Sequence, residues 1–380
     1  MHDNTRRVRI GLNAMLYSSE LSYRSAGVSH YIGGLLGALP RSDSSADYVA
    51  FHYLPQISAD GWEFVHARAA GGQPWRRILW EQFGQPAALR RSQVDLVHAP
   101  VYVGPLAASC PVVVTIHDLS HFIFPELFQP AKRVYLQTMT RITAKRAAAV
   151  ICDSENTRRD VLRLLQVPPE RAHTVLIGVD AEMQPLARER VERFRAERRL
   201  PERYILTVST LEPRKNIPAL IEAYCMLCRG GQPVPHLVIG GGKGWYFRAI
   251  EQQVERLGLR DHVVFTGFIP QQELPLWYNA SEIFVYPSLY EGFGMPPLEA
   301  MACGVPVITS DKASLPEVVG DGGLMVDTSK PELLATALQR LLDEPETRIE
   351  LGQRGQARAR LFSWEKTARE TASIYHAVLG

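Results

Sequence analysis

Two glutamates, Glu291 and Glu299, flank a glycine-rich segment in a spacing suited to binding a sugar compound. A strand-like run ends at Ser288, the turn after it holds Gly292 and Gly294, and two prolines then favour the start of a helix. The glycines leave backbone N–H groups uncovered at a helix N-terminus, which binds phosphate and hydroxyl groups. A carboxylate accepts hydrogen bonds from paired hydroxyls such as those of ribose. Either glutamate alone would be a solvated or helix-dipole residue, but the whole segment predicts a ligand site.

Two adjacent cations, Arg214 and Lys215, lie between a predicted strand that ends near Thr210 and a predicted helix from Ile217. Asn216 is expected to cap this helix. Fixed cations at a helix N-terminus stabilise a leaving diphosphate without a metal ion. Because the sequence has no Asp-x-Asp pair or histidine-rich cluster beside this segment, no metal site is expected there.

A histidine, His117, follows the apolar run 111–116 at the carboxyl end of a predicted strand, where open α/β sheets bind their ligands. Asp118 is expected to orient either the ring or the loop. Cys225 and Cys228 form one C-x-x-C without a second pair and are interpreted as core residues. The segment 238–245 lacks the G-x-G-x-x-G spacing and its acidic partner, which argues against a nicotinamide-dependent oxidoreductase.

Apolar, β-branched runs alternate with helical patterns along the chain, which predicts an α/β fold. The runs are near-continuous in Val, Ile and Leu, as in parallel strands buried on both faces. Roughly six runs in each half favour two sheets, and the Arg- and Glu-rich segment 178–201 places the boundary near 180. The predicted strands are 8–14, 47–54, 95–100, 111–118, 147–154, 173–180, 204–210, 236–242, 262–268, 282–288, 306–311 and 322–327.

Composition limits the partners and the cell compartment that we expect. A net charge of +2 gives no reason to expect a nucleic acid partner. No apolar run approaches the roughly 20 residues that span a bilayer, and scattered cysteines fit a reducing cytoplasm. The basic segments 75–83 and 130–150 predict helices that either pack against the first sheet or contact an anionic membrane.

The segment E-G-F-G-M-P-P-L-E-A-M-A-C-G-V-P-V-I (291–308) resembles the E-x7-E signature of glycosyltransferase family 4, the retaining enzymes of GT-B fold. The resemblance covers essentially the whole chain and is strongest in the second half. It implies an α/β GT-B architecture, with two Rossmann-like doubly wound domains facing each other across a cleft. Residues 1–180, completed by the C-terminal helix 364–380, would form the acceptor side, and residues 181–363 would bind the nucleotide-sugar donor.

The resemblance also implies roles for individual residues. Glu299 would hold the nucleotide ribose, and Arg214 and Lys215 would bind the donor diphosphate. Glu291 and His117 would lie beside the transferred sugar, which makes these two and the two cations the catalytic candidates. The other implied donor-binding residues are Gly27, Gly267, Phe268, Phe293, Gly294 and Met295.

The implied activity is retaining hexosyl transfer in polysaccharide biosynthesis, in the cytoplasm or at the inner face of the membrane. The segments 117–126, 211–216 and 291–304 resemble those of bacterial mannosyltransferases that use GDP-mannose. The expected partners are this donor and a glycan or lipid-linked acceptor, with no cofactor and no metal. Three alternatives stay open, namely another donor such as UDP-glucose, a same-fold epimerase or hydrolase, and a non-catalytic sugar-binding protein.

Overall fold

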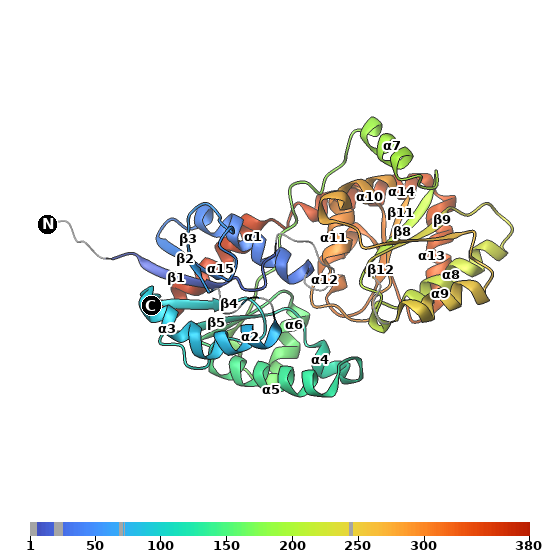
Figure 1. The fold of residues 1–380 in the computed structure, drawn as a ribbon. Helices are drawn as coiled ribbons and strands as arrows, with labels where there is room; N and C mark the ends of the chain where they lie inside the picture. Colours follow the sequence, from blue (N-terminus) through green and yellow to red (C-terminus); the bar gives the residue numbers. More distant parts are fainter. Residues whose placement is uncertain (1–5, 19–25, 68–70, 72, 243–245) are drawn as a thin grey trace. The chain divides into compact units, whose positions relative to one another are not determined.

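The computed structural model describes residues 6–18, 26–67, 71, 73–242 and 246–380, which form two compact units (Figure 1). Unit 1 comprises Met1–Gly178 together with Ser363–Gly380, and unit 2 comprises Val179–Phe362. The division therefore falls next to the predicted boundary at 180. Each unit is built around one all-parallel sheet, as the apolar runs predict.

The sheet of unit 1 has seven strands in the order β3-β2-β1-β4-β5-β6-β7. Sequence inspection missed β3, an edge strand that mixes polar and apolar residues and is only half-buried. It placed β7 over 173–180, but only the first residues of that run pair with β6, and the strand ends at Thr174. The strands are β1 (Val8–Asn13), β2 (Ala46–His52), β3 (Trp62–His66), β4 (Leu96–Ala99), β5 (Val112–Ile116), β6 (Ala149–Cys152) and β7 (Ala172–Thr174).

The sheet of unit 2 has six strands in the order β10-β9-β8-β11-β12-β13. In both sheets the strand order reverses direction beside the first strand of the unit, and ligands of doubly wound sheets bind at the carboxyl ends of the strands near this point. The strands are β8 (Tyr204–Val208), β9 (His236–Gly240), β10 (Val263–Gly267), β11 (Ile283–Tyr286), β12 (Val307–Ser310) and β13 (Leu324–Val326).

Helices cover both faces of each sheet. In unit 2, α8 packs beside α13 and α11 beside α14, on opposite faces of the sheet (Figure 1). The helices are α1 (Ala26–Ser42), α2 (Pro74–Leu79), α3 (Gln85–Arg91), α4 (Ser120–Ile123), α5 (Pro130–Arg146), α6 (Glu155–Asp160), α7 (Arg188–Glu197), α8 (Ile217–Arg229), α9 (Phe247–Arg256), α10 (Leu274–Ala280), α11 (Met295–Ala302), α12 (Leu315–Val319), α13 (Pro331–Asp343), α14 (Pro345–Ala359) and α15 (Trp364–Leu379), with a π-helical turn at Trp80–Gly84 between α2 and α3.

The last helix, α15, belongs to unit 1, where it lies beside α1 (Figure 1). The ring of Trp364 lies directly against Gly34 of α1, at a point where a Cβ atom would come within 2.3 Å of the ring. Thr367 anchors the same helix by donating a hydrogen bond to the carbonyl of Leu176 (2.7 Å). Among the helices that the structure describes, none is both long and apolar enough to cross a bilayer.

Candidate functional site

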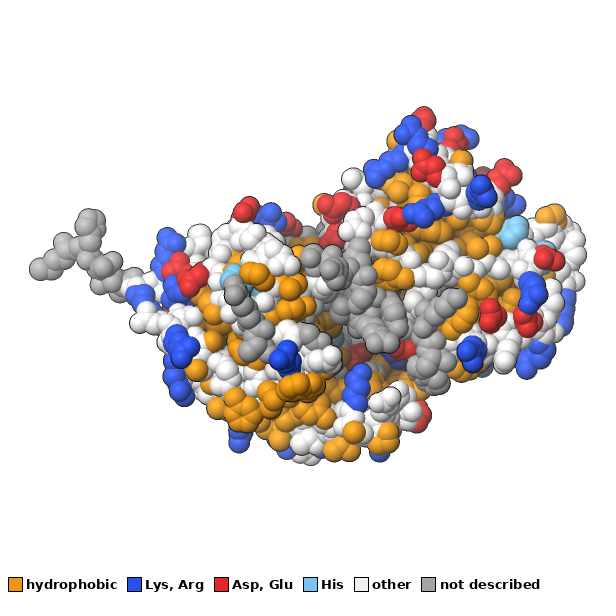
Figure 2. Space-filling view, in the orientation of Figure 1, with side chains coloured by type: hydrophobic (Ala, Val, Ile, Leu, Met, Phe, Trp, Pro, Cys, Tyr) orange, Lys and Arg blue, Asp and Glu red, His pale blue; other side chains and the backbone are white. Residues whose placement is uncertain are grey.

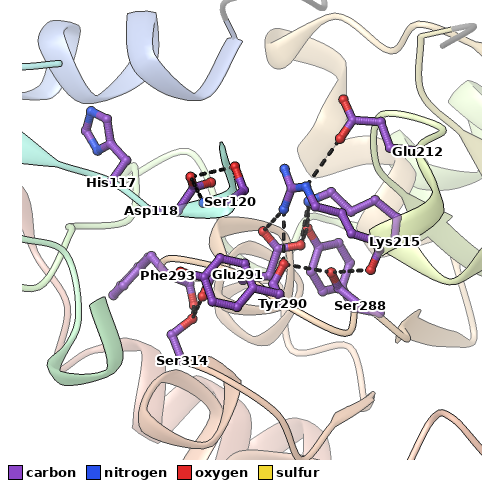
Figure 3. A network of polar contacts seen from close by, with 12 residues as sticks. His117, Asp118, Ser120, Glu212, Lys215, Ser288, Tyr290, Glu291, Phe293 and Ser314 are labelled. Atoms are coloured by element: carbon purple, nitrogen blue, oxygen red, sulfur yellow. Dashed lines mark hydrogen bonds and ion pairs between the residues drawn. The ribbon is translucent and has the colours of Figure 1, made fainter. Parts of the chain in front are cut away.

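A buried network in unit 2 joins three of the predicted residues. Lys215 Nζ donates hydrogen bonds to Glu291 and to the Tyr286 hydroxyl (2.8 Å), and that hydroxyl donates to Glu291 Oε1 (2.9 Å). Arg214 Nη1 donates to Glu291 Oε2 (3.2 Å). Figure 3 shows the Lys215 and Glu291 side chains pointing toward each other. The Glu291 carboxylate therefore bridges both cations that the sequence assigns to a diphosphate.

Backbone contacts hold the two segments of this network together. Leu289 N donates to the carbonyl of Arg214 (2.9 Å), so the turn after β11 is fixed against the turn after β8. The latter is a short 3₁₀ turn, Pro213–Lys215, followed by Asn216 in the left-handed conformation (φ 55°). The predicted cap is wrong, because the Asn216 side chain does not bond to the first turn of α8. Its Nδ2 donates instead to the carbonyl of Thr328 (2.7 Å), which ties the turn to the segment after β13.

The charges of this network are closely matched. Burial on its own raises the pKa of Glu291, but Lys215 and Arg214 outweigh it and lower that pKa to about 2. Burial and the adjacent Arg214 lower the pKa of Lys215, and the Glu291 carboxylate opposes them. Arg214 Nε also donates to Glu212 Oε2 (3.2 Å). Two carboxylates thus face two cations, and an incoming diphosphate would compete with both for the arginine.

The second predicted glutamate, Glu299, lies on α11 and is also buried. The Tyr278 hydroxyl donates to its Oε2 (2.7 Å), and Gln271 Nε2 lies at 3.5 Å from Oε1. The helix begins after Gly294, whose φ of 114° favours glycine, as the turn predicts. Sequence inspection missed Tyr278 and Tyr286, because a tyrosine in an apolar run is indistinguishable from a core residue.

The glycine turn before α11 is held in place by Ser314, which lies in the segment after β12. Ser314 Oγ lies 2.6 Å from the carbonyl of Phe293 and 3.0 Å from that of Glu291 (Figure 3). These carbonyls are engaged within the protein, which leaves the backbone N–H groups of residues 293–295 as the groups suited to a ligand. Gly267 ends β10 with φ 72° and open space where a side chain would be, and Phe268 after it is only partly buried.

In unit 1, His117 follows β5 and has a partner at each ring nitrogen. Its Nδ1 lies 2.6 Å from Asp153 Oδ2, and its Nε2 lies 2.8 Å from the carbonyl of Pro100. A carbonyl only accepts, so Nε2 carries a hydrogen. Burial disfavours a second proton, but Asp153 outweighs it and raises the pKa of His117. Both ring nitrogens are therefore engaged within unit 1, by Asp153 and by the carbonyl of Pro100.

The acidic partner of His117 is Asp153, which sequence inspection missed. Its signal was present: Asp153 directly follows β6, and Cys152 pairs with Ile116, so both strands end at the same edge. Asp118, the weaker candidate, orients the loop, because it accepts hydrogen bonds from Ser120 N (3.0 Å) and Ser120 Oγ (2.8 Å).

The remaining candidates give simpler results. Gly27 is exposed and lies in the first turn of α1. A cavity of about 170 Å³ in unit 1 borders Pro111 and Ala148, at the amino ends of β5 and β6, so it lies opposite the ligand edge. Cys225 is a buried core residue and Cys228 packs against the same core, as predicted. Within the described parts of the chain, no group of three or more His, Cys, Asp or Glu side chains has a metal-binding arrangement.

Comparison with known proteins identifies the class. The profile described as "Glycosyltransferase Family 4" matches residues 25–183, and that described as "Glycosyl transferases group 1" matches residues 189–358. The fold is similar to that of sucrose-phosphate synthase from Thermosynechococcus elongatus (TM-score 0.76, 23% identity, 98% of this chain and 99% of that one). It is also similar to WaaG, a glycosyltransferase of lipopolysaccharide biosynthesis (TM-score 0.74, 16% identity, 97% and 99%). The protein is thus a glycosyltransferase of GT-B fold.

Sequence similarity defines the family more closely. The chain is 34% identical to O-antigen chain mannosyltransferase B of Escherichia coli, over 95% of this chain and 99% of that protein. It is 33% identical to the serotype-specific mannosyltransferase WbdA of Escherichia coli, over 59% of this chain and 28% of that protein. The chain belongs to glycosyltransferase family 4, as its E-x7-E segment predicts.

Proposed function

We propose that the protein transfers a mannosyl group from GDP-mannose to a glycan or lipid-linked saccharide, in the cytoplasm. The observation that carries the donor sugar is the 34% identity with O-antigen chain mannosyltransferase B, which extends over 95% of this chain and hence over both units. The five cysteines are all free, which agrees with a reducing compartment.

Unit 2 binds the nucleotide in this proposal. Glu299 accepts hydrogen bonds from the ribose diol, and the backbone near Gly267 and Phe268 meets the base. Arg214 and Lys215 bind the diphosphate, which replaces part of their present contact with carboxylates. The backbone N–H groups of Phe293, Gly294 and Met295 contact the sugar and phosphate.

The transfer proceeds with retention and without a bound metal. The bond between the sugar C1 and the phosphate oxygen breaks, the acceptor oxygen bonds to C1 on the same face, and the acceptor proton passes to the leaving phosphate. Arg214 and Lys215 stabilise the growing diphosphate charge, and Glu291 stabilises the positive charge that develops on the sugar. His117, which has a partner at each ring nitrogen, is the residue of unit 1 assigned to the sugar, and it acts without accepting a proton.

The test is a panel of nucleotide sugars that includes GDP-mannose and UDP-glucose, measured first by thermal shift and then by turnover. GDP-mannose should give the largest shift, and NMR of the product should show the retained anomer. Activity should persist in excess chelator. A preference for UDP-glucose, an inverted product, or activity lost on chelation and restored by a divalent cation would each refute part of the proposal. Hydrolysis or epimerisation of the donor with no gain from acceptor would indicate a different enzyme.

The same proposal includes contact with an anionic membrane through one surface of unit 1. Trp75, Leu79 and Phe83 lie at four-residue spacing along α2 and the π-helical turn, and they are 58%, 48% and 76% exposed. Figure 2 shows hydrophobic side chains gathered over this region and α5. An exposed apolar stripe of this kind is uncommon in a soluble domain and fits the acyl–headgroup boundary of a bilayer.

Basic residues surround the stripe. Arg76 and Arg77 lie within it, and the 17-residue α5 carries no acidic residue. Burial and the charge of Glu81 raise the pKa of Tyr135 on α5, and the charge of Arg77 opposes them. Because these charges act over a short range, α5 lies close to the stripe. Each cation near an anionic surface contributes about 1 kcal/mol, so the surface is suited to anionic lipid. The cations of α5 are Lys132, Arg133, Arg141, Lys145 and Arg146.

Flotation with vesicles tests this contact. The protein should bind vesicles rich in phosphatidylglycerol and not those of phosphatidylcholine alone, and it should dissociate as salt rises. The triple change Trp75→Ser, Leu79→Ser and Phe83→Ser should abolish binding. Ile349→Ser, at a position 62% exposed in unit 2, should leave it unchanged. Equal binding by the triple variant and the parent would rule out this surface.

A further inference from the structure

In the segment that carries the exposed apolar stripe, apolar side chains face solvent and polar side chains are buried. Glu81 and Gln85 lie on the same run of chain as Leu79 and Phe83, yet the two polar residues are 4% and 0% exposed. Folding alone favours the opposite arrangement, with apolar residues inside and polar residues in water. The polar side chains therefore require a reason to be buried.

These side chains meet Asn13, the last residue of β1, and the three are named here the β1-edge cluster. Asn13 Nδ2 lies 3.2 Å from Glu81 Oε1 and 3.5 Å from Gln85 Oε1. Asn13 Oδ1 accepts from Met15 N (3.2 Å), which fixes the orientation of the Asn13 amide. The cluster thus lies at the carboxyl end of a central strand, the position at which doubly wound sheets bind ligands.

One donor of the cluster is left unsatisfied. Because Asn13 offers its NH₂ group, Gln85 must turn its oxygen toward Asn13 and its own NH₂ group away. Among the residues that the structure describes, the buried Gln85 Nε2 has no hydrogen-bond partner. Burying such a group without a partner costs about 1–3 kcal/mol, so a structural role alone does not account for it.

The chemistry of the other groups agrees with a binding role. Burial raises the pKa of Glu81, and Arg77 and Asn13 only partly oppose this. The segment also contains a π-helical turn, a feature that occurs frequently at functional sites. A carboxyl group that accepts and an amide that donates, held side by side, match a sugar hydroxyl, which does both.

We propose that the β1-edge cluster is a subsite for the hydroxyls of the acceptor saccharide, with Glu81 accepting and Gln85 donating hydrogen bonds. This inference rests on the proposed function. It assigns the acceptor-binding residues, which the donor-binding residues of unit 2 do not provide. The apolar stripe on the outer face of the same segment would then bring the enzyme to the surface that carries a lipid-linked acceptor.

The test uses octyl α-D-mannopyranoside as acceptor and GDP-mannose as donor, with three separate readouts: acceptor KM, donor hydrolysis without acceptor, and Tm. Glu81→Gln should raise the acceptor KM about 10- to 100-fold, because it weakens a charged hydrogen bond. Gln85→Met should raise it about 3- to 10-fold. Both variants should leave donor hydrolysis unchanged, and Gln85→Met should keep or raise the Tm, since it removes an unsatisfied donor.

A matched control is Gln253→Met in unit 2. Gln253 is also a buried glutamine, but its Nε2 donates to Glu222 Oε1 and to the carbonyl of Pro218 (both 3.1 Å). This variant should lose Tm and keep the acceptor KM. An acceptor KM within twofold of the parent for both cluster variants, or a lowered Tm for Gln85→Met, would overturn the subsite. Hydrolysis of GDP-mannose by the parent with no transfer to the mannoside would instead count against the proposed function.

Discussion

Glu291 holds the buried Lys215 and the partly buried Arg214 in place, so its replacement should affect stability and nucleotide binding in opposite directions. In Glu291→Gln, Lys215 and Arg214 lose the negative charge between them, while Lys215 keeps its bond to Tyr286 and Arg214 keeps those to Glu212 and to the carbonyl of Tyr290. Breaking a buried pair by removing one partner typically costs about 3–5 kcal/mol. The variant should therefore unfold more readily than the parent.

The depressed pKa of Glu291 corresponds to a free energy of the same order. A fall from the ordinary 4.5 to about 2 corresponds to about 3 kcal/mol at neutral pH. Because the folded pKa is depressed, this stability is present above pH 4.5 and is lost as the pH falls toward 2. For a unit of this size each kcal/mol shifts the Tm by about 2–4 °C, so Glu291→Gln should lower it by about 6–12 °C at pH 7. The difference from the parent should shrink in acid.

Nucleotide should reverse much of this loss. The diphosphate of GDP supplies the negative charge that the variant lacks, so GDP should raise the Tm of Glu291→Gln by more than it raises that of the parent. Turnover should still fall, because no carboxylate remains beside the sugar. The assay is thermal denaturation with and without GDP from pH 3 to 8, alongside steady-state kinetics.

The control is Glu350→Gln, which breaks a surface pair with Arg354 at a position 59% exposed in side chain. It should change the Tm by about 2 °C or less. An unchanged Tm for Glu291→Gln at pH 7, or a GDP shift smaller than that of the parent, would refute the view that this carboxylate neutralises the diphosphate-binding cations.

Four further predictions follow from the contacts within each unit. Arg214→Ala and Lys215→Ala should each lower kcat about 100- to 1000-fold with a smaller change in donor affinity, measured by steady-state kinetics. Glu212→Gln should instead tighten GDP binding, measured by calorimetry, because it removes a carboxylate that competes for Arg214. Glu299→Gln should weaken GDP binding about 10- to 150-fold with little loss of kcat at saturating donor, and normal affinity would exclude its ribose role. Asp153→Asn should lower the pKa of the imidazole it faces, so the alkaline limit of the pH–rate profile should move to lower pH; an unmoved limit would show that the imidazolium is not required.

The sequence predicts the sheets well because their strands carry the signal within themselves. A run such as Ile283–Tyr286 is buried on both faces, and its apolar character is visible without knowledge of its neighbours. The edge strand Trp62–His66 lacks this character because one side of it faces no further strand. The turn before α11 was equally readable, since a positive φ at Gly294 and prolines at the helix start are local requirements.

The partners within the site could not be predicted, because they come from distant segments. Lys215 and Glu291 are 76 positions apart, and no local pattern indicates that the lysine assigned to the diphosphate is neutralised by the carboxylate of another motif. Asn216 has the residue type of a helix cap, yet its side chain bonds 112 positions away. Residue type predicted the groups present in the site, whereas the tertiary fold decides which of them are paired.

This pairing has a consequence for catalysis. Cations that are already positioned by carboxylates need little rearrangement when diphosphate charge grows, which is the condition for stabilising a transition state. In the proposed donor complex the same carboxylates would weaken ground-state binding, because the diphosphate competes with Glu212 and Glu291 for the cations. Some of the binding energy is then not used to hold the donor and becomes available only as the phosphate bond breaks. Such energy raises kcat more than it lowers KM. We therefore expect Glu212 and Glu291 to contribute to catalysis by limiting how tightly Arg214 and Lys215 hold the donor before it reacts.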